Sequence, residues 1–161
     1  MTRGLGVTID RVRATDLTRI AAMERQCFSD PWSASAFRDL EQNPRVQFLC
    51  ARAGENEPAL GYVVAWFAAD EGEIANLAVA PEARGKGIGA ALLDAALTHA
   101  ERMHVSAVYL EVRDSNQTAR RLYASRGFAE VGRRRGYYRR PVEDAVILRR
   151  TFDSAVVNAE W

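Results

Sequence analysis

Long hydrophobic runs, cysteine and proline are scarce in this chain of 161 residues. Its longest apolar run, residues 60–69, is about half as long as the roughly 20 residues that a membrane-spanning helix requires. The N-terminal residues lack the apolar region and the small-residue cleavage site of a secretory signal. We therefore expect a cytoplasmic protein, and we expect its two cysteines, Cys27 and Cys50, to be reduced thiols rather than a disulfide.

An excess of charge of either sign is also missing, since 22 basic side chains face 21 acidic ones and the net charge is +1. No field of the whole molecule draws the chain to nucleic acid or to an anionic membrane, so its partners must be recognised by local sites. His99 and His104 lie apart from both cysteines, and no spacing typical of metal ligands is present. We expect a monomer with no metal, no membrane and no nucleic-acid partner.

The composition is otherwise ordinary for a globular protein, with 48% apolar and 27% charged residues and five prolines. The length fits one compact domain, which we place at residues 1–152. Residues 153–161 are expected to form a C-terminal tail.

Hydrophobic periodicity predicts alternating strands and helices. Strands are expected near residues 7–12, 45–53, 60–69, 72–79, 105–112, 128–134 and 142–149. Helices are expected from an N-cap at Thr15-Asp16 to Cys27, from Ser33 to just before Pro44, from a glycine-rich turn to Met103, and from Gln117 to Arg126, with Gly127 as a left-handed C′ residue. The order predicts an α/β fold with a mixed, mostly antiparallel central sheet and one parallel strand–helix–strand crossover over residues 72–112.

The turn Arg84-Gly85-Lys86-Gly87-Ile88-Gly89 lies between a predicted strand and a predicted helix. Small residues there let consecutive backbone N–H groups converge on an anion at the positive end of the helix. The turn therefore predicts a phosphate-binding cradle. It is not a Walker A loop, because Ile88 follows Gly87 and the required Gly-Lys-Ser/Thr ending is missing.

A dinucleotide-binding fingerprint is the weaker alternative for this turn. Gly85, Gly87 and Ala90 match the pattern G-x-G-x-x-A, and Glu111 ends the next predicted strand. Residues 81–84 intervene between the strand and the first glycine, however, and the rest of the chain supplies hairpins in place of further strand–helix units. A flexible turn without a ligand is the purely structural alternative, and we favour the anion site over both.

The pattern Arg84-x-x-Gly87-x-Gly89 resembles the acetyl-CoA signature R/Q-x-x-G-x-G/A of the GNAT acetyltransferase superfamily. Further segments resemble its RimI-like branch, the ribosomal-protein alanine N-acetyltransferases: Cys27-Phe28-Ser29-Asp30-Pro31-Trp32-Ser33, Leu110-Glu111-Val112-Arg113, Asn116, Leu122-Tyr123, Gly127-Phe128, Arg134-Arg135-x-Tyr137-Tyr138 and Glu143-Asp144-Ala145. The resemblance covers roughly residues 26–149. About ten N-terminal residues, the loop at residues 139–141 and the tail after Phe152 depart from it, which bears on the choice of acceptor.

This resemblance implies the GNAT fold, with helices on both faces of the sheet, and acetyl-CoA as cosubstrate. Main-chain groups of one strand end would bind the pantetheine arm, namely Leu77, Ala78 and Val79. The following turn would bind the pyrophosphate through Gly85, Lys86, Gly87, Ile88, Gly89 and Ala90. Asn116 matches the family's cofactor-contacting asparagine, and an N-cap of the next helix is its alternative or additional role.

Glu111 matches the general base. An α-amine has a pKa of roughly 7.7 to 8.0, so at neutral pH the amine is mostly protonated and a carboxylate must remove the proton, directly or through water. Two alternatives stay open. Glu111 could form a salt bridge with Arg113 or another cation, and Glu73 on the neighbouring strand could be the base, as in other GNAT branches.

Tyr123 matches the residue that protonates the departing coenzyme A thiolate, and an aromatic packed in the core is its structural alternative. The backbone N–H of Val79 would meet the developing oxyanion. Cys27 and Cys50 show no helical or cationic activation in the sequence. Direct transfer in a ternary complex is therefore expected rather than a covalent acyl-enzyme.

The predicted function is transfer of an acetyl group from acetyl-CoA to the N-terminal alanine of a small-subunit ribosomal protein, number eighteen. Another protein N-terminus, a lysine or a small amine is the alternative acceptor. A different class of function, an RNA-binding module, is suggested by the arginines and tyrosines from Arg133 to Arg140. The acetyltransferase prediction uses the same stretch as a hairpin that lines the peptide entrance.

Overall fold

The computed structural model describes residues 6–152, which divide into two compact units. Unit 1 contains the described residues up to Trp66 together with Ile74–Thr98, and unit 2 contains Phe67–Glu73 together with the described residues from His99 onward. The predicted tail, residues 153–161, lies outside the described residues. The extent of the predicted domain stays a prediction.

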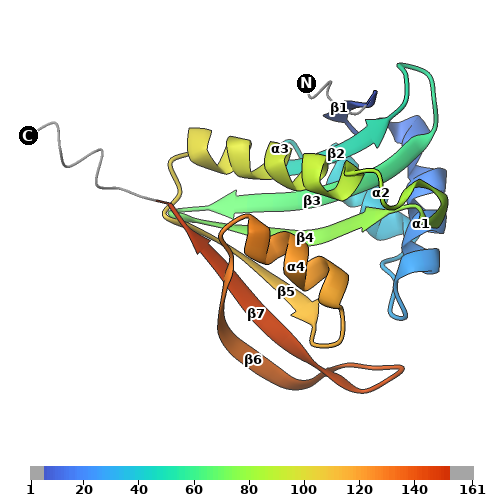
Figure 1. Ribbon diagram of the computed structural model, residues 1–161. Helices are drawn as coiled ribbons and strands as arrows, with labels where there is room; N and C mark the ends of the chain where they lie inside the picture. Colours follow the sequence, from blue (N-terminus) through green and yellow to red (C-terminus); the bar gives the residue numbers. More distant parts are fainter. Residues whose placement is uncertain (1–5, 153–161) are drawn as a thin grey trace, which may run out of the picture. The chain divides into compact units, whose positions relative to one another are not determined.

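Seven strands, four α-helices and two short 3-10 helices make up the described chain (Figure 1). In order they are β1 (Thr8–Arg11), η1 (Ala14–Asp16), α1 (Leu17–Cys27), α2 (Ala34–Gln42), β2 (Val46–Arg52), β3 (Ala59–Ala68), β4 (Glu71–Val79), η2 (Pro81–Ala83), α3 (Ile88–Arg102), β5 (Ala107–Arg113), α4 (Gln117–Ser125), β6 (Ala129–Tyr138) and β7 (Glu143–Thr151). Among these helices none is long and apolar enough to cross a membrane.

The sheet has the strand order β1-β2-β3-β4-β5-β7-β6. Strand β4 pairs with β5 in parallel, whereas β1–β2, β2–β3, β5–β7 and β6–β7 are antiparallel. A parallel neighbour cannot be reached by a tight turn, and α3 supplies the crossover between β4 and β5. The α/β class with a mostly antiparallel sheet and one parallel crossover, predicted from the sequence, is confirmed.

Aromatic packing holds the first part of unit 1 together. Phe37 of α2 lies with its ring centroid 5.9 Å from Phe48 of β2 and 5.7 Å from Tyr62 of β3. All three side chains are fully buried, and such ring pairs add stability beyond the area they bury. Helix α2 starts next to Ser33, as predicted, and Ser33 caps it by accepting a hydrogen bond from the N–H of Ala36 at 3.1 Å.

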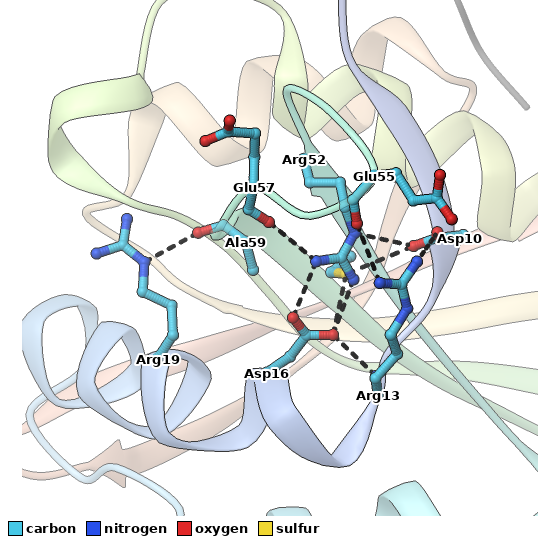
Figure 2. Close-up of polar contacts among 9 residues, drawn as sticks. Asp10, Arg13, Asp16, Arg19, Arg52, Glu55, Glu57 and Ala59 are labelled. Carbon is cyan, nitrogen blue, oxygen red and sulfur yellow. Dashed lines mark hydrogen bonds and ion pairs between the residues drawn. The ribbon is translucent and has the colours of Figure 1, made fainter.

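A buried ion cluster in unit 1 was not predicted (Figure 2). The guanidinium of Arg52, only 2% exposed, donates to both carboxylate oxygens of Asp16 at 2.8 and 2.9 Å. It also contacts Asp10 at 3.3 Å and the carbonyl oxygen of Glu57 at 3.1 Å. Asp16 does stand at the N-cap position of α1, but its side chain pairs with Arg52 and makes no cap hydrogen bond there. The capping role that we predicted for it is therefore wrong.

The cluster shifts the proton affinities of its members. Burial on its own works to raise the pKa of Asp16, but the hydrogen bonds and charge of Arg52 and the N–H of Arg13 lower it below its ordinary value. Burial raises the pKa of the neighbouring Cys50 thiol to about 12, so this side chain remains a neutral thiol at physiological pH. Both cysteines are free, as predicted.

We expect Arg52→Ala to lower the free energy of unfolding by about 3–5 kcal/mol, because it leaves the Asp16 carboxylate buried without its cation. Arg13→Ala is the control, since the Arg13–Asp10 pair is exposed and its loss should cost about 1 kcal/mol or less. Because the pKa of Asp16 is lowered in the folded state, its stabilising effect should begin to decline as the pH falls below about 4 and be lost as the pH passes through the still lower pKa of the folded state. Urea unfolding at pH 7 and pH 3 measures both effects, and equal losses in the two variants would contradict this account.

Unit 2 is built on β5, which pairs in parallel with β4 on one side and antiparallel with β7 on the other. Helix α4 follows β5 and ends before Gly127, whose φ of +85° is the left-handed C′ conformation predicted from the sequence. Strands β6 and β7 run further than predicted, so that the arginine-rich stretch up to Tyr138 is part of a β-hairpin.

Candidate functional site

The end of β4 and the glycine turn lie next to each other in the chain of unit 1. Arg84 folds back onto this strand end: its Nε donates to the carbonyl oxygen of Val79 at 3.1 Å, and its Nη2 lies 3.1 Å from the sulfur of Cys27. Directly after the strand, the N–H of Ala80 donates to the carbonyl oxygen of Leu60 on β3 at 2.9 Å. These contacts fix the path of the chain from the strand into the turn.

The backbone conformation of the turn is compatible with the predicted anion cradle. Gly85 and Gly87 have φ values of +78° and +81°, which side chains on L-residues rarely allow, and a Cβ on Gly85 would meet only open space. The first helical bond of α3 runs from the N–H of Ala91 to the carbonyl of Gly87 at 3.0 Å. The N–H groups of the preceding residues in the first turn of the helix have no acceptor within it, and they suit a phosphate.

Gly61 on β3 is a site residue that the sequence analysis missed. A Cβ at this position would lie 2.9 Å from the carbonyl oxygen of Ala78 on β4 and 3.0 Å from Leu92 of α3. Only glycine therefore lets the helix and both strands approach this closely. A glycine alone inside a predicted strand was the available signal, because it often marks a close approach of another backbone.

Glu24 is the second residue that was missed, and it lies on α1. Its carboxylate is 1% exposed and accepts hydrogen bonds from the hydroxyl of Tyr62, from Nδ2 of Asn76 at 2.6 Å and from the N–H of Trp32 at 2.9 Å. Burial raises its pKa, and the three hydrogen bonds oppose that effect. Glu24 thus ties the segment between α1 and α2 to β3 and β4. Its spacing of four residues from the buried Ile20 was the sequence signal.

Glu111 lies on β5 in unit 2, where its Oε2 atom is enclosed and has no hydrogen-bond partner among residues 6–152. Nε of Arg134 lies 2.6 Å from that oxygen, an ion pair whose angles do not make a hydrogen bond. Arg113, the partner considered from sequence, instead pairs with Glu143 at 3.2 Å. Glu111 therefore does form a salt bridge, as the alternative proposed, and its partner is Arg134 rather than Arg113.

Glu73 stays a rival to Glu111 as a base. In the parallel register of β4 and β5 it lies opposite Tyr109. Glu111 is two residues further along β5 and therefore projects from the same face of the sheet as Glu73, because side chains alternate along a strand. The structure thus brings both carboxylates to one face of the sheet within unit 2.

Tyr123 on α4 is buried, with its ring centroid 5.7 Å from that of Phe128. Burial, followed by the proximity of Tyr138, raises its pKa above the ordinary value of a phenol. Tyr123 therefore does pack in the core, which was the structural alternative to a catalytic role. It keeps the phenol in the protonated form, which is the form that can donate a proton or a hydrogen bond.

Asn116 caps α4, because its Oδ1 accepts a hydrogen bond from the N–H of Ala119 at 3.1 Å. The N-cap role predicted as one possibility is confirmed. The cap uses the Oδ1 atom of the side-chain amide, so the Nδ2 group can still donate hydrogen bonds to a ligand.

A model of the acetyltransferase (GNAT) family matches residues 17–128, more than half of the chain. The chain belongs to this family. Membership in the GNAT family rules out the dinucleotide-binding interpretation of the glycine turn. It also agrees with a sheet in which β4 and β5 form the parallel pair.

Curated relatives of this GNAT chain are similar over most of their length. The ribosomal protein bS18-alanine N-acetyltransferase of Haemophilus influenzae is 34% identical over 143 residues, which are 87% of this chain and 95% of the relative. The N-alpha-acetyltransferase RimI of Mycobacterium tuberculosis is 37% identical over 150 residues, 89% of this chain and 92% of the relative. The crystal structure of the ribosomal-protein-S18-alanine N-acetyltransferase from Escherichia coli superposes with a TM-score of 0.81 at 32% identity, covering 90% of this chain and 93% of the other.

Proposed function

We propose that this protein transfers the acetyl group of acetyl-CoA to the N-terminal alanine of ribosomal protein bS18 in the cytoplasm. The observation that carries the proposal is the similarity, along nearly their whole length, to the Haemophilus influenzae and Escherichia coli proteins that are named for this activity. The anion cradle of unit 1 and the enclosed carboxylate of unit 2 supply chemistry that such a reaction needs.

Unit 1 would bind the cosubstrate. The pyrophosphate of acetyl-CoA is negatively charged and its pantetheine arm contains amide carbonyls, so both parts can accept hydrogen bonds from N–H donors. The first turn of α3 with the glycine turn, residues 85–90, offers such donors to the pyrophosphate. The main chain of Leu77, Ala78 and Val79 at the end of β4 would pair with the arm as an added strand would, and the N–H of Val79 would meet the oxyanion. Asn116 of unit 2 matches the family's cofactor-contacting asparagine.

Unit 2 would move the protons. Glu111 would accept the proton of the acceptor's α-ammonium, because it offers a carboxylate oxygen that no hydrogen bond among residues 6–152 occupies. Tyr123 would donate to the sulfur of coenzyme A as negative charge develops there, since its raised pKa keeps the phenol protonated. Direct attack by the amine on the thioester then needs no acyl-enzyme, and the buried Cys50 thiol is a poor nucleophile.

We expect Tyr123→Phe to lower kcat on the order of 10²-fold while the protein stays folded, because only the hydroxyl is removed and the ring still packs against Phe128. Single-turnover acetyl transfer over a range of pH measures this effect. Phe128→Leu is the matched control, since it alters the same ring contact without touching the hydroxyl. A Tyr123→Phe variant that matches the wild type at every pH would remove Tyr123 from the chemistry.

The acceptor is tested with acetyl-CoA and a set of peptides that differ only in their first residue, one of them beginning as the alanine-initiated N-terminus of bS18. Each peptide carries an internal lysine, and mass spectrometry locates any acetyl group. We expect acetylation at the α-amine of the alanine peptide. Acetylation confined to lysine, or equal rates with every first residue, would contradict the proposed acceptor.

The hairpin arginines give little support to an RNA-binding function. Arg133 contacts three carboxylates, those of Asp114, Glu130 and Asp144, at 3.1 to 3.7 Å. Arg134 faces Glu111. The carboxylates beside Arg133 and Arg134 offset the positive charge that phosphates would need at these two residues.

A further inference from the structure

The guanidinium of Arg134 lies against the carboxylate of Glu111, within unit 2. Its Nε is 2.6 Å from Oε2 of Glu111, the oxygen that is enclosed and has no hydrogen-bond partner among residues 6–152. An enclosed carboxylate oxygen without any partner would be costly, so in this state the positive charge of Arg134 compensates it.

Few contacts hold the side chain of Arg134 in place. Its side chain is 59% exposed, and besides Glu111 its guanidinium contacts the ring of Tyr137 at 5.6 Å, a residue that is itself half exposed. The ion pair lacks the angles of a hydrogen bond. Arg134 is the exposed partner of the pair, whereas the Glu111 side chain is only 23% exposed, so water can receive the guanidinium at a small cost once another cation takes its place at Glu111.

Arg113, at the end of β5 in the same unit, shows what an arginine fixed by several contacts looks like. It pairs with Glu143 at 3.2 Å, donates to the carbonyl oxygens of Arg139 and Pro141 at 2.9 and 3.1 Å, and lies 4.5 Å above the ring of Tyr138. Several contacts from different directions lock that side chain in place. Within residues 6–152, by contrast, Arg134 has one ionic contact, with Glu111, and one ring contact, with the half-exposed Tyr137.

We propose that Arg134 stands in for the charged amine of the acceptor and is exchanged for it at Glu111 in every catalytic cycle. The inference rests on the proposed function and deepens it. An incoming α-ammonium is a cation that can also donate hydrogen bonds to the enclosed oxygen, whereas Arg134 here supplies charge alone. The ammonium therefore replaces Arg134, which moves into water.

The exchange also separates substrate from product. Once Glu111 has taken the proton and the amine has become an amide, the acetylated chain end carries no charge. The neutral amide cannot compete with a guanidinium for a carboxylate, so Arg134 returns to Glu111 once the carboxyl group has released its proton to water. Competition with Arg134 therefore favours binding of a charged N-terminus and release of the neutral, acetylated N-terminus.

The test compares two labelled peptides of the same sequence, one with a free N-terminal alanine and one with that alanine acetylated. Their dissociation constants are measured by fluorescence anisotropy for the wild type and for Arg134→Ala, Arg134→Lys and Arg135→Ala. Arg135 is the next residue of β6 and is exposed, so it controls for the general charge of the hairpin. Thermal unfolding of each variant confirms that it is folded.

We expect Arg134→Ala to bind the free-amine peptide roughly two- to fivefold more tightly, the factor that corresponds to the loss of a competing exposed ion pair. Its affinity for the acetylated peptide should not change. The KM for the free-amine peptide should fall by the same factor with kcat within about twofold, and Arg134→Lys should restore the values of the wild type. Arg135→Ala should leave the ratio of the two affinities as it is.

Three outcomes would overturn the inference: equal tightening of both peptides, which indicates general repulsion by the hairpin; no change; or weaker binding of the free amine, which makes Arg134 a contact of the peptide. Failure of the proposed function looks different. A wild type that binds the peptide but transfers no acetyl group would contradict that function, while the comparison of the two peptides would still decide the role of Arg134.

Discussion

Gly89→Glu is expected to abolish binding of acetyl-CoA, weakening it at least about 100-fold, which corresponds to ~2.7 kcal/mol. Gly89 is in the first turn of α3, where the N–H groups have no acceptor in the helix. A carboxylate placed there would repel the pyrophosphate and fill its space. It would not unfold the helix, because negative charge near a helix N-terminus is favourable.

Gly89→Ala is the matched control for this prediction, since it adds a Cβ without charge and removes a glycine from a helix. Calorimetric titration with acetyl-CoA should show near-normal binding for Gly89→Ala and none for Gly89→Glu. Gly87 is a less informative position, because its φ of +81° means that any side chain also strains the backbone. Normal binding by Gly89→Glu would contradict the cradle at this turn.

Glu111→Gln is expected to lower kcat on the order of 10²-fold and to leave the affinity for acetyl-CoA nearly intact, because the amide keeps the shape of the side chain and loses the basic oxygen. Steady-state kinetics with the alanine peptide and calorimetry with acetyl-CoA measure the two quantities separately.

Glu73→Gln is the matched control for Glu111→Gln, since Glu73 projects from the same face of the sheet on the neighbouring strand. We expect it to retain most of the turnover. If the two variants exchange these results, so that Glu111→Gln is as active as the wild type, the base is Glu73.

The elements of this fold could be predicted well because their signals are local. Alternating apolar residues identified β2, a continuous apolar run identified β3, and Ser33 and Gly127 marked the start of one helix and the end of another. The strand order could not be reached this way. That β7 lies between β5 and β6 depends on pairing between distant segments, which periodicity does not encode.

The polar contacts of the candidate site were harder to predict than its location. The glycine turn was found because its pattern requires special backbone geometry, and the positive φ values of Gly85 and Gly87 agree with that requirement. The partners of buried charges were not found. Arg52 with Asp16, and Arg134 with Glu111, are pairs separated by 36 and 23 residues, and either arginine looks like a surface residue in the sequence.

The central claim, that this chain binds the thioester cosubstrate at the end of β4 and the turn before α3, is tested most directly by titrating the wild-type protein with acetyl-CoA and with coenzyme A in a calorimeter. The account predicts saturable binding of both at one site per chain. Absence of saturable binding for either form would contradict it, and the roles assigned to Glu111, Tyr123 and Arg134 would fall with it.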